Sequence, residues 1–410
     1  MPARRDEVVG RACRMIAPRA RFGILVSLVL LAGCSGSGAV SVDTPSTTVS
    51  TTAAPTTTVP AAPNSLPGMP PPLSPTDVYA ATRELSPAVA DHLPRVYVPN
   101  SQSNTVSVID PATFQVIDTY PSGGQEPQHV VPSYDLRTLY VNNDLPIGGG
   151  SLLPIDPRTG RAGQPIPVRD PYNLYFTPEG KYAIVVAEAD RSLDLYDPHS
   201  WQRVNSIPVP DCGGVNHMDF TADGRFALTS CEFSGRVAVI DIAEPRLVRM
   251  IDLPGGRGGK PQDVKLSPDG RTFYVADMVA NGVYIVDAAS FENTGFVPTG
   301  DGAHGLYVTR DSKAMLITNR HEGSLSVWDF AANALVRKWF IPGGGSPDMG
   351  NISADGRVFW VAGRHHGEVY AIDIVDWRLL ARIPVGKGAH GLTVWPQPGR
   401  YSTGHTGVMR

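Results

Sequence analysis

A unit of 41 to 46 residues recurs along the chain and constrains the fold more than any other feature. Its most regular mark is an aspartate that follows a short apolar segment, as in VSVID, VAVID and LSVWD. The marks are Asp110, Asp156, Asp197, Asp241, Asp287, Asp329 and Asp373. Aspartate at the end of a strand is suited to an Asx turn, in which its carboxylate accepts a backbone N–H two residues on. Self-similarity with a period of about 20 to 50 residues indicates a solenoid, a propeller or an array.

Each unit also carries a second turn, which reads YDLR, PEGK, ADGR, PDGR, RDSK, ADGR and QPGR in the successive copies. Together the two turns divide the unit into four short segments with the alternation of β-strands, as in propeller blades. The sequence therefore predicts an all-β, seven-bladed propeller of four-stranded blades over residues 95–410. The first copy begins at a second strand and the last copy ends after an inner strand, so we expect the C-terminal strand to close the first blade. The pattern does not place residues 401–410.

The second segment of the unit reads YVPN, YVNN, YVAD and LITN, and in this the chain resembles the YVTN-type β-propeller family. The resemblance covers about 315 of the 410 residues and implies the seven-bladed fold. It implies no single function, because propellers of this kind include binding scaffolds, lactonases and proteins that hold haem or copper.

The N-terminal region reads as a targeting segment. Several arginines precede an apolar run, Phe22–Leu31, which is too short to span a bilayer and is typical of a signal peptide. The run ends in Leu31-Ala32-Gly33-Cys34, which resembles the bacterial lipobox. That resemblance implies a lipoprotein signal peptide over residues 1–33 and a lipid on the thiol of Cys34. An ordinary secretory signal with a chance cysteine is the alternative.

A Ser/Thr/Pro-rich stretch follows over residues 34–75 and lacks the apolar side chains needed to offset the entropy of ordering. We expect a disordered linker that holds the propeller away from a membrane. Residues 76–94 are expected to form a short lead-in segment. The protein is thus predicted to be exported and anchored to the cell membrane, facing the periplasm or the exterior.

Polar residues begin the inner strand of every unit, where the strands start around the central channel. These positions are His129, Asn173, His217, Asp263, His304, Asp348 and His390. The loops between second and third strands open on the same face and add Asn142, Asn143, Asp144, Glu188, Glu232, Asp277, Arg320, His321, Arg364, His365 and His366. The sequence therefore predicts a ligand-binding mouth that is rich in histidine. His92, His199 and His405 are expected to be structural or surface residues.

Three interpretations of the rim stay open. His, Asn and Asp share a short side chain that can bond to a neighbouring backbone, so the rim residues could simply tether adjacent blades. Converging imidazoles could instead hold a transition metal or a haem, as the resemblance to haem d1 and multi-copper propellers implies for His129, His217, His304 and His390. A small organic or peptide ligand is the third interpretation. No CxxCH haem-attachment motif occurs in the chain.

Two cysteines remain in the propeller, Cys212 and Cys231, both at the face that carries the mouth. Because the protein is expected in an oxidising compartment, they are predicted to form a disulfide. The alternative is a pair of thiolates that join His217 in a metal site.

The net charge of −4 and the pI of about 6.2 argue against nucleic-acid binding. No catalytic constellation can be read from the spacing of the residues, so an enzyme is not expected. The sequence favours a membrane-anchored, monomeric module that binds a small molecule or a protein through its mouth. A metal- or haem-binding propeller is the first alternative. Hydrolysis of a lactone, by Arg320 or Arg364 with Glu188, is a weaker one that rests on the residue types of related propellers.

Overall fold

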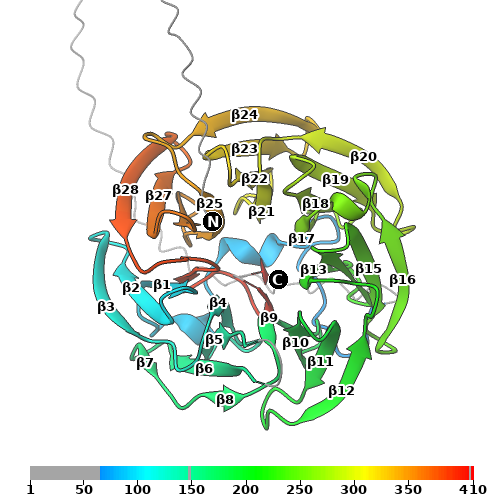
Figure 1. Ribbon diagram of the computed structural model, residues 1–410, viewed down its shortest axis with the longest axis horizontal. Helices are drawn as coiled ribbons and strands as arrows, with labels where there is room; N and C mark the ends of the chain where they lie inside the picture. The colour runs from blue at the N-terminus through cyan, green and yellow to red at the C-terminus, as the bar shows by residue number, and fades with distance from the viewer. Residues whose placement is uncertain (1–64, 146–148, 406–407) are drawn as a thin grey trace, which may run out of the picture. The chain divides into compact units, whose positions relative to one another are not determined.

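The computed structural model describes residues 65–145, 149–405 and 408–410. The predicted signal peptide, Cys34 and most of the predicted linker lie outside these residues. The described chain forms seven antiparallel sheets arranged around one axis (Figure 1). The predicted all-β, seven-bladed propeller is therefore confirmed. Within these residues, no helix has the length and apolar character needed to cross a membrane.

Four strands build a regular blade, from the channel outward. The first blade contains β29 (Thr393–Trp395), β1 (Arg95–Asn100), β2 (Thr105–Asp110) and β3 (Gln115–Pro121). The second contains β4 (Pro127–Pro132), β5 (Leu139–Asn143) and β6 (Ser151–Asp156), with β7 (Arg161–Ala162) and β8 (Ile166–Pro167) both paired to β6. The third contains β9 (Pro171–Phe176), β10 (Ala183–Ala187), β11 (Ser192–Tyr196) and β12 (Arg203–Pro208).

The remaining four blades follow the same order. The fourth contains β13 (Val215–Phe220), β14 (Phe226–Cys231), β15 (Arg236–Asp241) and β16 (Arg246–Asp252). The fifth contains β17 (Pro261–Leu266), β18 (Thr272–Asp277), β19 (Gly282–Asp287) and β20 (Asn293–Pro298). The sixth contains β21 (Ala303–Val308), β22 (Ala314–Asn319), β23 (Ser324–Asp329) and β24 (Ala334–Phe340). The seventh contains β25 (Pro347–Ile352), β26 (Val358–Gly363), β27 (Glu368–Asp373) and β28 (Arg378–Pro384).

The repeating turns have the chemistry that the sequence predicts. All seven marker aspartates accept a backbone N–H two or three residues on, as Asp110 does from Ala112 at 2.9 Å and Asp329 does from Ala332 at 2.8 Å. In the other turn the third residue has a positive φ, for example 73° at Gly224. Glycine adopts this conformation without a steric cost, which explains the recurring D-G pair.

Apolar side chains pack between neighbouring blades, not within one central core. One such cluster joins Val186 and Leu193 of the third blade to Ala238 and Ile240 of the fourth. Each blade therefore depends on both neighbours, and the ring must close. β29 closes it by pairing with β1, with Val394 opposite Val96, which confirms the predicted closure by the C-terminal strand.

The C-terminal tail continues past β29 and enters the central channel. Its strands β30 (Ser402–Gly404) and β31 (Val408–Met409) pair with each other, and β30 adds to the channel edge of β9 (Figure 1). Arg410 reaches the fourth blade, where its guanidinium lies 2.6 Å from Asp219. The tail, which the sequence pattern did not place, thus crosses from the first blade to the third and fourth.

The lead-in segment covers the end of the channel that the D-G turns surround. It contains the 3-10 helices η1 (Ala80–Arg83) and η2 (Pro87–Val89), and a third, η3 (Gly256–Gly258), lies in the loop before β17. Tyr79 donates its hydroxyl to the carbonyl of Leu266 at 2.8 Å. Residues 65–75, which the sequence analysis assigned to the linker, also contact the propeller, since the N–H of Leu66 donates to the carbonyl of Asp223.

The predicted disulfide is present between Cys212 and Cys231, whose Cα atoms are 4.9 Å apart. It joins the loop before β13 to the end of β14 within the fourth blade. The alternative in which two thiolates join His217 in a metal site is therefore wrong, because both sulfur atoms are consumed in the bond.

Gly404 provides a direct test of the docked tail. Its φ is 108°, and a Cβ there would lie 2.3 Å from the Cα of Tyr175. Gly404→Ala is expected to lower the free energy of unfolding by at least about 1–3 kcal/mol, since backbone strain adds to a clash with backbone. The control is Gly258→Ala, where a Cβ meets nothing within 4 Å. Urea unfolding measures both variants, and equal stability for the two would contradict the docking of the tail on β9.

Candidate histidine site in the central channel

The seven rim residues surround the channel as predicted, but they are buried. Each has an exposed fraction of 2% or less, so they line the closed centre of the propeller and not a solvent-filled mouth. Strand pairing also divides them into two sets. His129, His217 and Asp263 directly precede the residue that resumes pairing after a bulge, whereas His304 and Asp348 lie one residue earlier. The side chains of the two sets therefore point in different directions.

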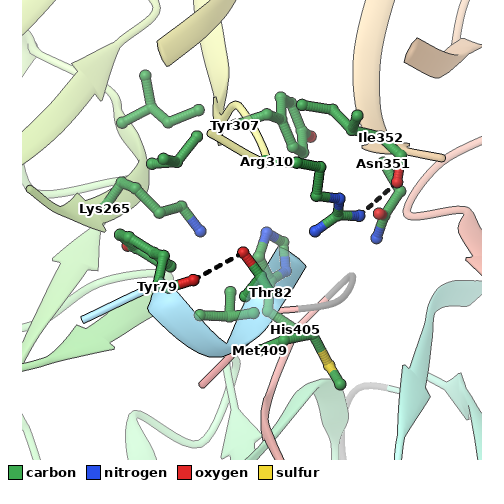
Figure 2. Close-up of a pocket in the computed structure, with 12 residues that line it drawn as sticks. Tyr79, Thr82, Lys265, Tyr307, Arg310, Asn351, Ile352, His405 and Met409 are labelled. Carbon is green, nitrogen blue, oxygen red and sulfur yellow. Dashed lines mark hydrogen bonds between the residues drawn. The ribbon is translucent and has the colours of Figure 1, made fainter. Parts of the chain in front are cut away.

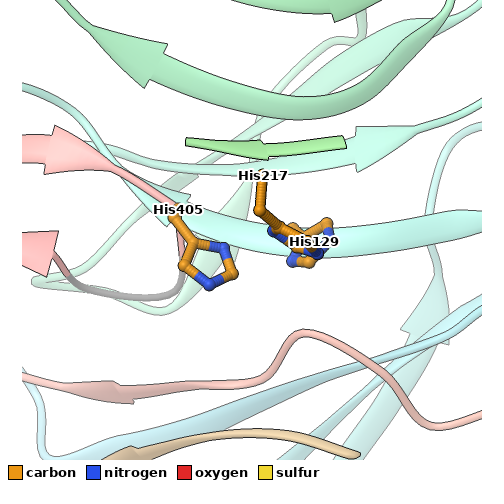
Figure 3. Close-up of side chains that lie close together, drawn as sticks. All are labelled: His129, His217 and His405. Atoms are coloured by element: carbon orange, nitrogen blue, oxygen red, sulfur yellow. The ribbon is translucent and has the colours of Figure 1, made fainter. Parts of the chain in front are cut away.

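His405 completes a cluster with His129 and His217. Ligand atoms of His129, His217 and His405 all lie within 4.8 Å of one another (Figure 3). The ring centroids of His217 and His405 are 4.6 Å apart, and those of His129 and His390 are 4.7 Å apart. We call His129, His217 and His405 the histidine cluster. The expectation that His405 is a scattered structural or surface residue is wrong, because the tail carries it to the axis.

Burial keeps the imidazoles of this centre neutral. The pKa values of His129, His217 and His390 lie well below the usual range, first because the rings are desolvated and then because positive charges on their neighbours repel another proton. The pKa of His405 is lowered by burial and partly restored by Asp263. Neutral imidazole is the form that binds a metal, so the cluster is ready for one at neutral pH.

Several imidazole nitrogens in the cluster have no hydrogen-bond partner. Both ring nitrogens of His129 and the Nε2 atom of His217 are buried and unpaired among the described residues. Such atoms carry a desolvation cost that a ligand would recover. A transition-metal ion fits this donor set, since imidazole is a preferred ligand of zinc, copper, nickel and iron.

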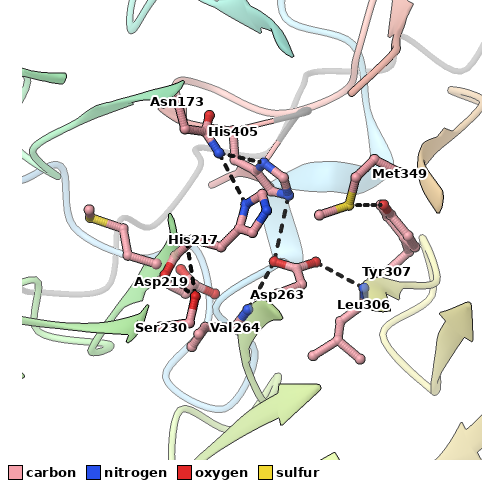
Figure 4. Close-up of polar contacts among 12 residues, drawn as sticks. Asn173, His217, Asp219, Ser230, Asp263, Val264, Leu306, Tyr307, Met349 and His405 are labelled. Carbon is pink, nitrogen blue, oxygen red and sulfur yellow. Dashed lines mark hydrogen bonds and ion pairs between the residues drawn. The ribbon is translucent and has the colours of Figure 1, made fainter. Parts of the chain in front are cut away.

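Two further side chains orient the cluster (Figure 4). The amide nitrogen of Asn173 lies 3.0 Å from Nδ1 of His217 and 3.3 Å from Nδ1 of His405. Asp263 lies 3.5 Å from Nε2 of His405, which places the proton on Nε2, so the Nδ1 lone pair that faces Asn173 is the one that would have to turn to a metal. A carboxylate that accepts the second N–H of a metal-ligating histidine is a common outer-sphere arrangement.

His304 belongs to a separate ion-pair network around Asp348. Arg320 lies 2.9 Å from Asp348 and 3.1 Å from His304, and His304 itself lies 3.3 Å from Asp348. Arg364 approaches the same carboxylate to 3.8 Å and His390 to 3.5 Å. His304 lies outside the histidine cluster, and its Nε2 faces Arg320 and Asp348.

The interpretation in which rim residues bond to the backbone of the adjacent blade explains Asp263 but not the histidines. Asp263 accepts the N–H of Leu306 in the next blade at 2.9 Å. The equivalent links in other blades come from residues that the sequence analysis missed. These links run from Met218 N–H to the Tyr175 hydroxyl, from Leu266 N–H to Asp219, and from Gly350 N–H to the Tyr307 hydroxyl. The signal for them was a polar residue near the end of an otherwise apolar strand, as in PYNLYF and VNHMDF.

Among the predicted mouth residues of the loops, the acidic side chains of the second and third blades lie across the ring from the arginines of the sixth and seventh blades. On one side, burial and the neighbouring Glu232 and Asp170 raise the pKa of Glu188 to about 8. Burial and Asp170 likewise raise the pKa of Asp144, and the two carboxyl groups share a hydrogen bond. Arg320 and Arg364 lie on the other side.

The other loop residues have structural partners. His321 lies 3.3 Å from Asp301, His366 bonds to the Ser346 hydroxyl at 2.8 Å, and the backbone N–H of His365 donates to that hydroxyl. Asn143 donates to the carbonyl of Ser122, and Asp277 accepts from the N–H of Lys260. Asn142 is buried, and both its amide atoms lack a partner among the described residues. His92 accepts a hydrogen bond from Trp395, and His199 is exposed, as expected.

These features define a seven-bladed propeller with a buried, neutral histidine cluster on its axis. The chain belongs to the YNCE-like beta-propeller family, whose model matches residues 53–204 and 256–398. This agrees with the predicted YVTN-type relationship. The stretch between the two matches contains the fourth blade, with His217 and the disulfide.

Solved structures share the fold at low sequence identity. Kuenenia stuttgartiensis hydrazine synthase has a TM-score of 0.54 and 20% identity over 64% of this chain and 87% of its own. A putative 6-phosphogluconolactonase from Bacteroides uniformis has a TM-score of 0.58 and 14% identity over 73% and 98%. The dihydro-heme d1 dehydrogenase NirN has a TM-score of 0.53 and 16% identity over 75% of both chains. No curated protein matches the sequence. At these identities the likeness shows the fold alone.

The metal-free protein is expected to be most stable near pH 6.5. Below that pH the unfolded chain protonates its histidines while the buried ones stay neutral, so stability falls by about 1.4 kcal/mol per pH unit for each such histidine. The raised pKa of Glu188 acts in the opposite direction, because the unfolded chain loses this proton above about pH 4.5 while the native protein keeps it up to about pH 8.

Urea unfolding between pH 5 and pH 8.5, with a chelator present, measures this profile. Five central histidines outnumber the four raised carboxyls, Asp144, Asp170, Glu179 and Glu188, so the acid limb should dominate below pH 6.5. Glu188→Gln should lessen the fall in stability above pH 6.5 and steepen the fall below it, because it removes a group that titrates in both ranges. A profile without an acid limb would contradict the neutral, buried state of the histidines.

Proposed function

We propose that the protein is a membrane-anchored propeller that binds one transition-metal ion in its central channel, through His129, His217 and His405. The observation that carries the proposal is the convergence of three buried imidazoles, of which His129 has both nitrogens unpaired. A structural role alone leaves these unpaired atoms at a cost of about 1–3 kcal/mol each. A metal ion would recover that cost.

The three histidine ligands favour a site with an open coordination position over a structural site that is closed by four protein ligands. Structural zinc sites use four protein ligands, whereas three ligands leave a position for water or a substrate. Zn–N bonds are about 2.0–2.1 Å long, so the three rings would have to move closer together than in the metal-free protein. His129 can rotate toward the others without breaking a hydrogen bond. His390, in contact with His129, is the nearest source of a fourth ligand.

A haem is a poorer fit to the same centre. The rings of His129 contact those of His217, His390 and Tyr172 with centroids 4.7 to 5.5 Å apart. These contacts leave no slot for a porphyrin between the rings. The proposal therefore narrows the cofactor alternative of the sequence analysis to a bare metal ion.

The site of action follows from the N-terminal sequence. Acylation of Cys34 would hold the protein in the cell membrane, with the Ser/Thr/Pro-rich linker as a spacer on the extracytoplasmic side. A metal-binding module in that place would capture or present an ion outside the cytoplasm. A monomer suffices, since all the ligands come from one chain.

Metal titration of the full-length protein tests the proposal. After treatment with a chelator, the protein in detergent is titrated with Cu(II) and with Zn(II), and bound metal is measured by mass spectrometry. We expect one equivalent, and an affinity at least about tenfold lower in His405→Ala. His304→Ala and His199→Ala are the controls and should bind like the unmodified protein. Unchanged affinity in both His405→Ala and His129→Ala would refute the metal site.

Recognition of a small zwitterionic ligand at the mouth is the second candidate function. The carboxyl groups of Glu188 and Asp144 favour it, because their raised pKa values keep them protonated at neutral pH and a ligand ammonium group would restore their charged form. Arg320 and Arg364 would meet the anionic group of the same ligand. Arg364→Gln should weaken such a ligand without changing the metal stoichiometry. The two candidates are thereby separable in one protein preparation.

A further inference from the structure

A polar cavity lies beside His405, next to Tyr79 and Thr82 of the lead-in segment (Figure 2). Its volume is about 40 Å³. Inner strands of the fifth to seventh blades form its wall, and η1 with the tail strand β31 forms its cover. His405 lies between this cavity and the histidine cluster, since it belongs to both linings.

Two cationic side chains, Lys265 and Arg310, point into the cavity (Figure 2). Lys265 has an exposed fraction of 5%. Neither residue forms an ion pair with a carboxylate among residues 65–145, 149–405 and 408–410, although ion pairs are recorded for many other cations of the chain. Buried lysines and arginines are rarely left unpaired, because desolvating a charge is costly.

The hydrogen bonds of Arg310 leave its charge uncompensated. Its guanidinium donates to the carbonyls of Ile352 and Ser353 and to the side-chain oxygen of Gln397, all of which are neutral acceptors. The loss of solvent lowers the pKa of Arg310 to about 10, with only a weak opposing effect from Asp355. The group stays charged at neutral pH nevertheless.

Asp263 is the carboxylate on the same strand as Lys265, but its oxygens already have other partners. Its oxygens accept the N–H groups of Val264 and Leu306, both at 2.9 Å, and face Nε2 of His405 at 3.5 Å. It lies beyond ion-pair distance of Lys265. Asp263 and Asp355 act on the two cations only from beyond ion-pair distance, so neither carboxylate contacts Lys265 or Arg310 at the cavity.

We propose that this cavity binds one small monovalent anion, such as chloride, between the ammonium group of Lys265 and the guanidinium of Arg310. The two cations argue for an anion, and the small cavity suits a small one. The cavity exceeds the roughly 10–15 Å³ that a single water needs, so a small ion has room. Apolar side chains of Leu306, Ile352 and Met409 complete the lining, which suits a weakly hydrated anion.

The bound anion would hold the closed end of the channel together. Lys265 belongs to the fifth blade and Arg310 follows the inner strand of the sixth, while Met409 belongs to the tail. Neutralising the two cations removes a repulsion at the point where blades, tail and lead-in segment meet. This role does not depend on the metal proposed above.

Thermal unfolding of the full-length protein tests the proposal, with a chelator present to exclude metal effects. The melting temperature is measured in sodium chloride and in sodium gluconate at equal ionic strength. We expect chloride to raise it saturably, because a ligand that binds only the native state stabilises that state. Lys265→Met should abolish the shift. Lys387→Met, which removes the same charge from an exposed position, should keep it.

A second comparison separates an anion site from a hidden ion pair. In gluconate, Lys265→Met should be at least as stable as the unmodified protein, because it removes a buried charge without a partner. A strong loss of stability there would mean that Lys265 is paired internally and would overturn the proposal. An equal chloride shift in Lys265→Met and the unmodified protein would overturn it too.

Bromide provides a direct readout that needs no variant. Crystals of the unmodified protein soaked in bromide should show an anomalous peak between Lys265 and Arg310. Should Lys265→Met fail to fold, Arg310→Gln replaces it in the melting experiment. Absence of the bromide peak, with no chloride shift in the unmodified protein, would overturn the proposal.

Discussion

The C-terminal chain closes this propeller twice, and the rest of the structure depends on that closure. β29 pairs with β1 and completes the ring, which leaves no blade with an unpaired inner edge. The chain then crosses the channel to β9, where Gly404 permits a backbone approach that no side chain allows. The tail thereby becomes part of the channel wall. Without it the axis would lose His405 and the buried pair of Arg410 with Asp219.

Burial decides the chemistry of the axis. A ring of polar residues at a solvent-filled mouth would hold protonatable histidines with ordinary pKa values. Inside the closed channel the same side chains stay neutral, and some of their nitrogens lack partners. The desolvation that keeps them neutral also makes them good metal donors. The neighbouring cavity shows the opposite case, in which the buried groups stay charged and an anion is the suitable partner.

The sequence repeat predicted the fold correctly. The positions of the site residues could not be predicted as well, because they depart from the repeat. The marker aspartates act through contacts two or three residues away, so their role follows from local sequence. The rim residues were aligned by their sequence steps, whereas strand pairing places His304 and Asp348 at the first residue of the bulge and His217 at the second. A shift of one residue turns a strand side chain in another direction, which explains why His304 joins Asp348 and not the histidine cluster.

The sequence by itself determined the seven blades, the Asx turns, the closure by the last strand and the pairing of the two propeller cysteines. These features depend on local turn chemistry, on the repeat period and on the order of segments within the unit. Only the tertiary structure decided that the rim is buried and that His405 lies beside His129 and His217. It also decided that Lys265 and Arg310 share a cavity. His405 reaches the axis, and the cavity gains its cover, by the path of a tail that has no counterpart in the repeat, and no spacing along the chain encodes that path.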